Sequence, residues 1–175
     1  MKRKSIQYLI AAFVTVLAVS AASAQKPANS AIEVKDDEFS NKLTVTLKEQ
    51  PVSANLTFTL TSTVKKSGPR SIADLDFAQL EFISTTGKRE YGNSDNEVNF
   101  MVDGKRVRGG AATSGPLTDK LTHDGKELVI GVIYLSSLEQ IARGKEVKMK
   151  LGENVFTLDE ATRRNIKEFL KALGR

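Results

Sequence analysis

The chain has 175 residues, with 26 Lys and Arg against 21 Asp and Glu, one histidine and no cysteine. The absence of cysteine excludes disulfides, thiolate metal sites and a cysteine nucleophile, so stability must come from packing. The formal net charge of +5 includes three cations at residues 2–4. The rest of the chain is therefore much closer to neutral, and its charge gives little support to an acidic partner.

The first 24 residues read as a cleavable secretory signal peptide. Residues 2–4 form a positive start, an apolar stretch runs from Ile6 to Val19, and Ala22-Ser23-Ala24 supplies the small residues of a cleavage site. A membrane anchor is the alternative, but a span needs about 20 apolar residues and this stretch is shorter. We therefore expect export to the periplasm or the cell exterior, and no transmembrane span after cleavage.

Cleavage after Ala24 would leave 151 residues with 23 cations and 21 anions, a net charge of +2. A charge this small gives no support to nucleic-acid binding through bulk charge. The length suits one domain, which buries about 70% of its unfolded surface. We expect a flexible lead-in over 25–31 and a single β-rich domain over 32–175.

Alternation of apolar and polar residues with period two predicts half-buried strands along the domain. The alternating runs are 43–47, 56–64, 98–102 and 147–151. The run 128–135 is apolar throughout and predicts a central strand covered on both faces, where Gly131 marks a bulge or a close backbone approach. Residues 71–84 predict either a strand bulged near Ala78-Gln79 or a helical turn over 72–76 leading into a strand.

Turn signals separate these strands. Asp103-Gly104 predicts a two-residue hairpin, because both central positions need a positive φ, and Asp124-Gly125 repeats the signal. Thr86-Gly87 and residues 152–154 predict further reversals.

Two capping boxes predict two helices. Ser136-Ser137-Leu138-Glu139 opens a short helix that ends at Gly144, and Thr157-Leu158-Asp159-Glu160 opens a C-terminal helix that ends at Gly174. The second helix carries an apolar stripe made of Ile166, Phe169, Leu170 and Leu173. The fold class we expect is mainly β (α+β): an antiparallel β-sandwich or a strongly curved sheet, with a short helix and a C-terminal helix packed on it.

The C-terminal part of the chain also carries a resemblance. Residues 147–152, then Phe156-Thr157-Leu158-Asp159-Glu160, then a charged helix that ends near Phe169-Leu170 resemble the close of small uncharacterised exported bacterial proteins. The resemblance covers the strand hairpin and the capped helix only. It implies the same fold and localisation, and it implies no activity.

The residue types allow little catalytic or metal chemistry. His123 lies in a predicted turn and no Gly-x-Ser-x-Gly elbow is present, so we expect no catalytic triad. Asn93, Asp95 and Glu97 have the spacing of a calcium loop but lack its glycine and its final glutamate. The acidic run 36–38 has the oxygen ligands for an irregular calcium site, but a short acidic run near a flexible end is typical of a solvated surface. We expect no catalytic residue, no metal and no cofactor.

Basic residues at predicted strand ends form the candidate site. If these tips converge, they make an anion-binding patch for an envelope protein or an acidic polymer. Its members are Lys65, Lys66, Arg70, Lys88, Arg89, Lys105, Arg106 and Arg108. The alternative is that strand ends are charged for solubility. Likewise the threonine row 57, 59, 61 and 63, with Thr44 and Thr46, is either a hydroxyl array that orders water or an ordinary wet face of a sheet.

The function that this sequence favours is that of an exported, non-catalytic β-domain acting as an accessory or interaction module. One alternative is a small binding protein for an apolar or anionic ligand held inside the sheet. A second is a hydrolase that uses dispersed carboxylates, whose separation is spatial and is not readable from sequence. The partner and the oligomeric state are left open.

Overall fold

The computed structural model describes residues 30–66, 77–88, 90–91, 98–107, 118–121 and 125–175. The predicted signal peptide lies outside these residues, as does the lead-in up to residue 29. Two residues of the predicted lead-in are described: the Ser30 hydroxyl accepts from the Ile32 N–H at 3.2 Å, and the Ala31 carbonyl accepts from the Lys48 N–H at 2.8 Å.

The described residues form ten strands and two helices. The strands are β1 (Ile32–Asp37), β2 (Lys42–Ser53), β3 (Leu56–Lys65), β4 (Phe77–Ser84), β5 (Val98–Val102), β6 (Lys105–Val107), β7 (Thr118–Leu121), β8 (Glu127–Tyr134), β9 (Val147–Leu151) and β10 (Asn154–Thr157). The helices are α1 (Leu135–Arg143) and α2 (Glu160–Ala172).

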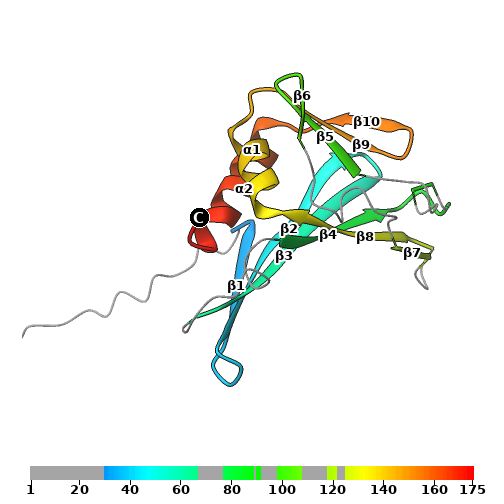
Figure 1. The fold of residues 1–175 in the computed structure, drawn as a ribbon. Coiled ribbons are helices and arrows are strands. Elements are labelled where there is room, and N and C mark those ends of the chain that lie inside the picture. The colour runs from blue at the N-terminus through cyan, green and yellow to red at the C-terminus, as the bar shows by residue number, and fades with distance from the viewer. Residues whose placement is uncertain (1–29, 67–76, 89, 92–97, 108–117, 122–124) are drawn as a thin grey trace, which may run out of the picture.

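The strands make two antiparallel sheets. The six-stranded sheet has the order β1-β2-β3-β4-β8-β7, and the four-stranded sheet has the order β10-β9-β5-β6. The smaller sheet and both helices lie over the larger sheet, so one core is enclosed between them (Figure 1). The predicted fold class, a mainly antiparallel β structure with a short helix and a packed C-terminal helix, is confirmed.

The core is apolar and tightly filled. Side chains from both sheets and both helices surround one interior gap of about 10 Å³, roughly the room for a single water molecule. They include Phe58 and Leu80 of the large sheet, Met149 of the small sheet, Ile141 of α1 and Ile166 of α2. This gap is too small for an organic ligand, so within the described residues the core gives no support to a carrier that holds a ligand between its sheets.

β2 runs well beyond its predicted end at residue 47 because it contains bulges. Leu47 pairs with Leu60 and Gln50 with Phe58, so β2 has one extra residue between them. The buried Gln50 side chain donates hydrogen bonds to the carbonyls of Lys48 at 2.8 Å and Glu49 at 3.1 Å. The amide therefore satisfies backbone acceptors at the irregularity.

At the two places where a bulge was one of the predicted alternatives, the structure has none. β4 pairs with β3 and β8 in unbroken register through Ala78 and Gln79. Ala78, Leu80 and Phe82 face the core in unbroken alternation, because Phe77 is exposed on the outer face and does not have to be buried with them. Gly131 likewise pairs with Leu80 without a shift. The strand around it is interior to the sheet, as predicted, but its outer face is only partly covered. The predicted turn over 72–76 lies outside the described residues.

Both helices begin at residues other than those predicted. The N-cap of α1 is Tyr134, with no side-chain capping bond, because the strand passes directly into the helix. The N-cap of α2 is Asp159, whose carboxylate accepts from the Thr162 N–H at 2.7 Å. The Thr157 box is wrong, since β10 runs to Thr157. The predicted ends hold, with Gly144 as the C-cap of α1 and Gly174 after α2.

Candidate functional site

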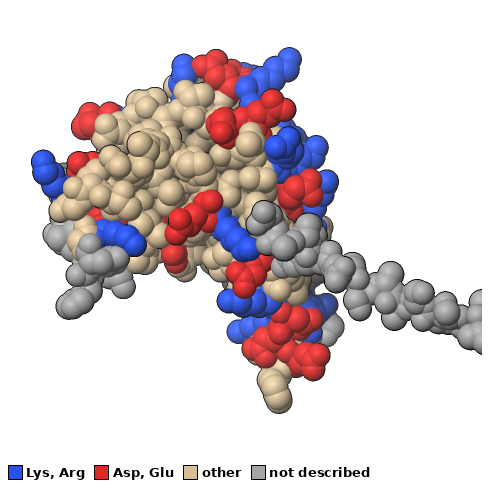
Figure 2. Space-filling model, turned by 180° about the vertical axis from the view of Figure 1, so that it is seen from behind, with Lys and Arg blue, Asp and Glu red and all other residues tan. Residues whose placement is uncertain are grey.

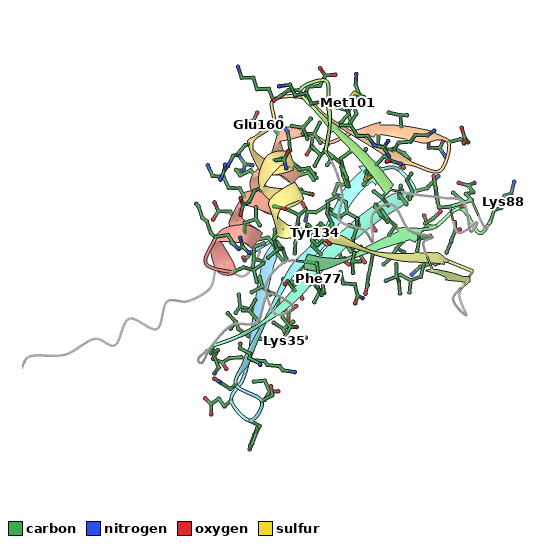
Figure 3. The ribbon with its side chains drawn as sticks, viewed as in Figure 1. Lys35, Phe77, Lys88, Met101, Tyr134 and Glu160 are labelled. Carbon is green, nitrogen blue, oxygen red and sulfur yellow. The ribbon has the colours of Figure 1, made fainter. Side chains whose placement is uncertain are left out.

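The predicted basic tips do not lie together where the structure describes them. Lys65 and Lys66 lie at the end of β3, where the Lys66 ammonium bonds the Asp36 carboxylate. Lys88 lies beyond the end of β4, at another corner of the molecule (Figure 3). Lys105 and Arg106 form the start of β6 in the four-stranded sheet.

The remaining members of that predicted patch, Arg70, Arg89 and Arg108, lie outside the described residues. Figure 3 labels residues near three of the predicted tips, namely Lys35, Lys88 and Met101, and these are well separated. The five described cations thus occupy separate parts of the surface, and only Arg106 joins a larger cationic feature.

That feature is the outer face of the four-stranded sheet. Met101 of β5 pairs with Lys148 of β9 on one side and with Arg106 of β6 on the other. Two residues along β9, on the same face, Lys150 pairs with both Asn99 and Val155. All of these side chains point outward, because Phe100 and Met149, which alternate with them, are buried.

Together these residues line a surface groove of about 320 Å³, which we call the outer groove. Its lining residues are Asn99, Phe100, Met101, Arg106, Lys148, Lys150 and Val155. Met101 is 46% exposed and Val155 is 61% exposed, so the groove combines open apolar surface with three cations. The volume is at the lower end of the range of small-ligand sites.

The cations of the outer groove are accessible to an incoming anion. The Arg106 guanidinium donates to the Asn99 side-chain oxygen at 2.6 Å, a neutral partner that orients the group without cancelling its charge. Lys148 contacts Glu146 at 2.8 Å, and Lys150 contacts Glu153 at 3.9 Å. Both ion pairs are on the surface, where such pairs contribute little and exchange readily.

A turn at one end of the outer groove is held by Asp103. Asp103 and Gly104 have φ values of +49° and +77°, as the predicted hairpin requires. The Asp103 carboxylate accepts from the backbone N–H groups of Lys145 and Glu146, each at 2.9 Å. These bonds, the Glu146 N–H first, lower the pKa of Asp103. The β5–β6 hairpin is thereby tied to the loop before β9.

Sequence reasoning found one residue of this groove and missed the others. Arg106 belongs to one of the predicted basic tips, whereas Lys148 and Lys150 are the polar positions of the predicted strand 147–151. A sequence signal does exist, because these side chains occupy the outward positions of their strands, as do Asn99 and Met101. The signal becomes informative only when β5 is known to pair with β9.

Other candidate groups have structural uses or cannot be placed. His123, Asn93, Asp95 and Glu97 lie outside the described residues. Within the described part of the chain, no three carboxylate or histidine groups are arranged to hold a metal ion. The Thr44 and Thr63 hydroxyls lie 3.0 Å apart across β2 and β3, so they bond one another.

One carboxylate is fully buried among the described residues. The two oxygens of Glu127 accept hydrogen bonds from the backbone N–H groups of Glu90 and Tyr91, each at 2.9 Å. Glu127 therefore fixes the 90–91 segment to β8, and its oxygens are occupied by backbone donors rather than open to a substrate. Within that segment, burial is the main cause of a raised pKa at Tyr91.

Comparisons of this chain with protein-family models, curated proteins and solved structures gave no match. The resemblance of its C-terminal hairpin and helix to exported bacterial proteins stays a prediction. Of the helices in the described residues, neither has the length and apolar character needed to cross a membrane.

Proposed function

We propose that this protein is an exported, non-catalytic interaction module that binds through the outer groove. The bound group is anionic and carries an apolar part. Export rests on the N-terminal pattern of a positive start, an apolar stretch and Ala22-Ser23-Ala24. The expected location is the periplasm or the cell exterior.

The observation that carries the proposal is the cross-strand row Lys148, Met101 and Arg106. Two cations flank one exposed apolar side chain on a rigid sheet, and Lys150 with Val155 repeats the combination beside them. Paired cations select an anion through charge-assisted hydrogen bonds. The apolar surface between them adds burial for a hydrophobic group attached to that anion.

The residue types that line the groove also favour binding over catalysis. Its polar lining consists of Lys, Arg and Asn side chains. These residues can hold and orient an anion, whereas a hydrolase of the expected type needs two carboxylates flanking the substrate. Glu146 and Glu153 contact Lys148 and Lys150 but do not line the groove.

The test uses three probes that separate charge from apolar surface. Octyl phosphate has both, inorganic phosphate has only the anion, and octyl glucoside has only the chain. Calorimetric titration of the secreted protein should show the tightest binding for octyl phosphate, and added salt should weaken it. Equal binding of octyl glucoside would contradict the proposal.

A matched pair of variants places the binding on this face. Lys148→Ser with Lys150→Ser should weaken octyl phosphate binding by at least about tenfold, because loss of even one of the two charge-assisted hydrogen bonds has that effect. Arg164→Ser with Lys167→Ser removes the same charge from the exposed side of α2 and should leave binding unchanged. If both variants weaken binding equally, the site lies elsewhere.

A further inference from the structure

The hairpin between β1 and β2 projects from the body of the molecule, at the end away from the four-stranded sheet (Figure 1). We call residues 36–41 the hairpin tip. It carries Phe39, whose side chain is 105% exposed. A single exposed apolar residue is ordinary on a protein surface. Phe39 is distinguished by the way its turn is held and by the charges beside it.

The turn that presents Phe39 is fixed by its own hydrogen bonds. The Asp37 carboxylate accepts from the backbone N–H of Phe39 at 3.0 Å and from that of Ser40 at 3.2 Å, and the Ser40 hydroxyl also donates to it. Asn41 closes the turn with φ +54°, and its carbonyl accepts from the Lys66 N–H at 3.0 Å. A turn ordered in this way loses little entropy when the ring meets a partner.

The hairpin tip is acidic next to the exposed ring. Asp36, Asp37 and Glu38 precede Phe39, and the Ser40 hydroxyl is the main cause of a lowered pKa at Asp37. Figure 2 shows acidic side chains gathered near the end of this hairpin, with basic ones closer to the body. The tip therefore joins an anionic group to an apolar one.

This chemistry matches the outer groove of the same chain. The groove offers Met101 and Val155 as apolar surface and three cations around them. A thioether packs favourably against an aromatic ring, and ammonium or guanidinium groups near the ring add a cation–π attraction. The carboxylates of Asp37 and Glu38 beside the ring would meet the oppositely charged ammonium groups of Lys148 and Lys150.

The tip cannot reach the groove of its own molecule. Lys35 on β1, next to the tip, and Met101 in the groove lie at opposite ends of the structure (Figure 3). We infer that the hairpin tip of one copy docks in the outer groove of the next, so that the protein self-associates head to tail. The inference rests on the proposed function, because it names the partner of the same groove.

A contact of this kind is heterologous, since the two copies contribute different surfaces. It produces a ring if the rotation between copies closes, and an open chain if it does not. An anionic membrane is a poorer partner for the tip, because Asp37 and Glu38 beside Phe39 would be repelled by its surface.

Sedimentation velocity of the secreted protein over a range of concentrations tests the inference. We expect the mass to rise with concentration at low salt and to fall toward the monomer as salt is added. The tip variant, Glu38→Lys with Phe39→Ser, should be monomeric, as should the groove variant, Lys148→Glu with Lys150→Glu. All four residues are exposed, and circular dichroism should report unchanged folds.

Mixing the two variants is the decisive step. The tip variant keeps an intact groove and the groove variant keeps an intact tip, so only one contact can form per pair. The mixture should therefore give a dimer and nothing larger. A control with Arg164→Glu and Lys167→Glu, the same charge reversal placed on α2, should associate like the unmodified protein.

A monomer at every concentration, or a mixture that forms no dimer, would overturn the inference. A symmetric dimer that survives in either variant alone would do the same. Binding of octyl phosphate by a strictly monomeric protein would leave the proposed function standing without this partner. Loss of octyl phosphate binding would remove the proposed function itself, so the two failures are distinguishable.

Discussion

The Asn165 side-chain amide donates a hydrogen bond to the Gln50 side-chain oxygen at 2.8 Å, across 115 residues of sequence. Gln50 is buried at the bulge of β2, and its side-chain N–H groups donate to the carbonyls of Lys48 and Glu49. One amide thus connects the C-terminal helix to the irregular part of the longest strand. The pair fixes how α2 sits on the large sheet.

Replacement of Gln50 by Ala should lower the free energy of unfolding by about 1–3 kcal/mol, because it leaves the part-buried carbonyls of Lys48 and Glu49 and the Asn165 amide without their partner. Urea denaturation measures the change. Asn165→Ala should cost less, and the double variant should cost less than the two single changes added together. Strict additivity would mean that the two side chains do not act as a pair.

Acid should destabilise the protein through Asp37, Asp103 and Asp159, whose pKa values lie below the ordinary 3.8. For Asp159 the main cause is the Thr162 N–H at the start of α2. A carboxyl group whose pKa is lowered by folding stabilises the native state above its unfolded pKa, and this stability is lost as the pH falls through the folded value. The urea midpoint should therefore fall at pH values below about 3.8.

Asp159→Asn separates titration from capping. Asparagine keeps an oxygen that accepts from the Thr162 N–H, so at neutral pH stability should fall only by the part that the carboxylate charge contributes. The variant cannot titrate, and its urea midpoint should fall less steeply in acid than that of the unmodified protein. Identical slopes would show that Asp159 has the same pKa in the folded and unfolded states.

Local signals in the sequence predicted much of the fold. The apolar stripe of α2 and the Asp103-Gly104 hairpin depend on neighbouring residues, and both are present as expected. The parity of Leu56, Phe58 and Leu60 likewise predicted which face of β3 is buried. Both predicted caps lie two residues from the observed ones, because α1 begins directly after β8 and so includes Ser136, whereas pairing with β9 extends β10 to Thr157.

The outer groove could not be predicted, because it depends on which strands become neighbours. Arg106, Lys148 and Val155 come from three strands, and their outward alternation is typical of any half-buried strand. The bulge at Gln50 was missed for a related reason. Its stabilising partner, Asn165, is distant in sequence and gives no local sign of the contact.

The packing of α2 leads to a prediction about the whole domain. Ile166, Phe169, Leu170 and Leu173 are all buried, so the helix is part of the core rather than a free surface element. Phe169→Ala should cost about 3–5 kcal/mol, the usual loss for a fully enclosed ring. Ending the chain at Leu158 should abolish cooperative thermal unfolding, because burial of these four side chains at about 1.5–3 kcal/mol each is comparable to a small domain's net stability of about 5–15 kcal/mol. Calorimetry measures both effects, and a cooperative melt of the truncated chain within a few degrees would contradict the prediction.

The grouping of cations on one face should also govern binding to a charged matrix. Replacement of Arg106, Lys148 and Lys150 by Ser should shift elution from a sulfonate resin to clearly lower salt. A control with Lys42, Lys88 and Lys167 replaced by Ser loses the same charge from separate elements. Three cations on one sheet face can meet the matrix together and so create a stronger local potential than three scattered ones. If both variants elute at the same salt concentration, net charge alone controls retention, and the outer groove is no special anion-binding surface.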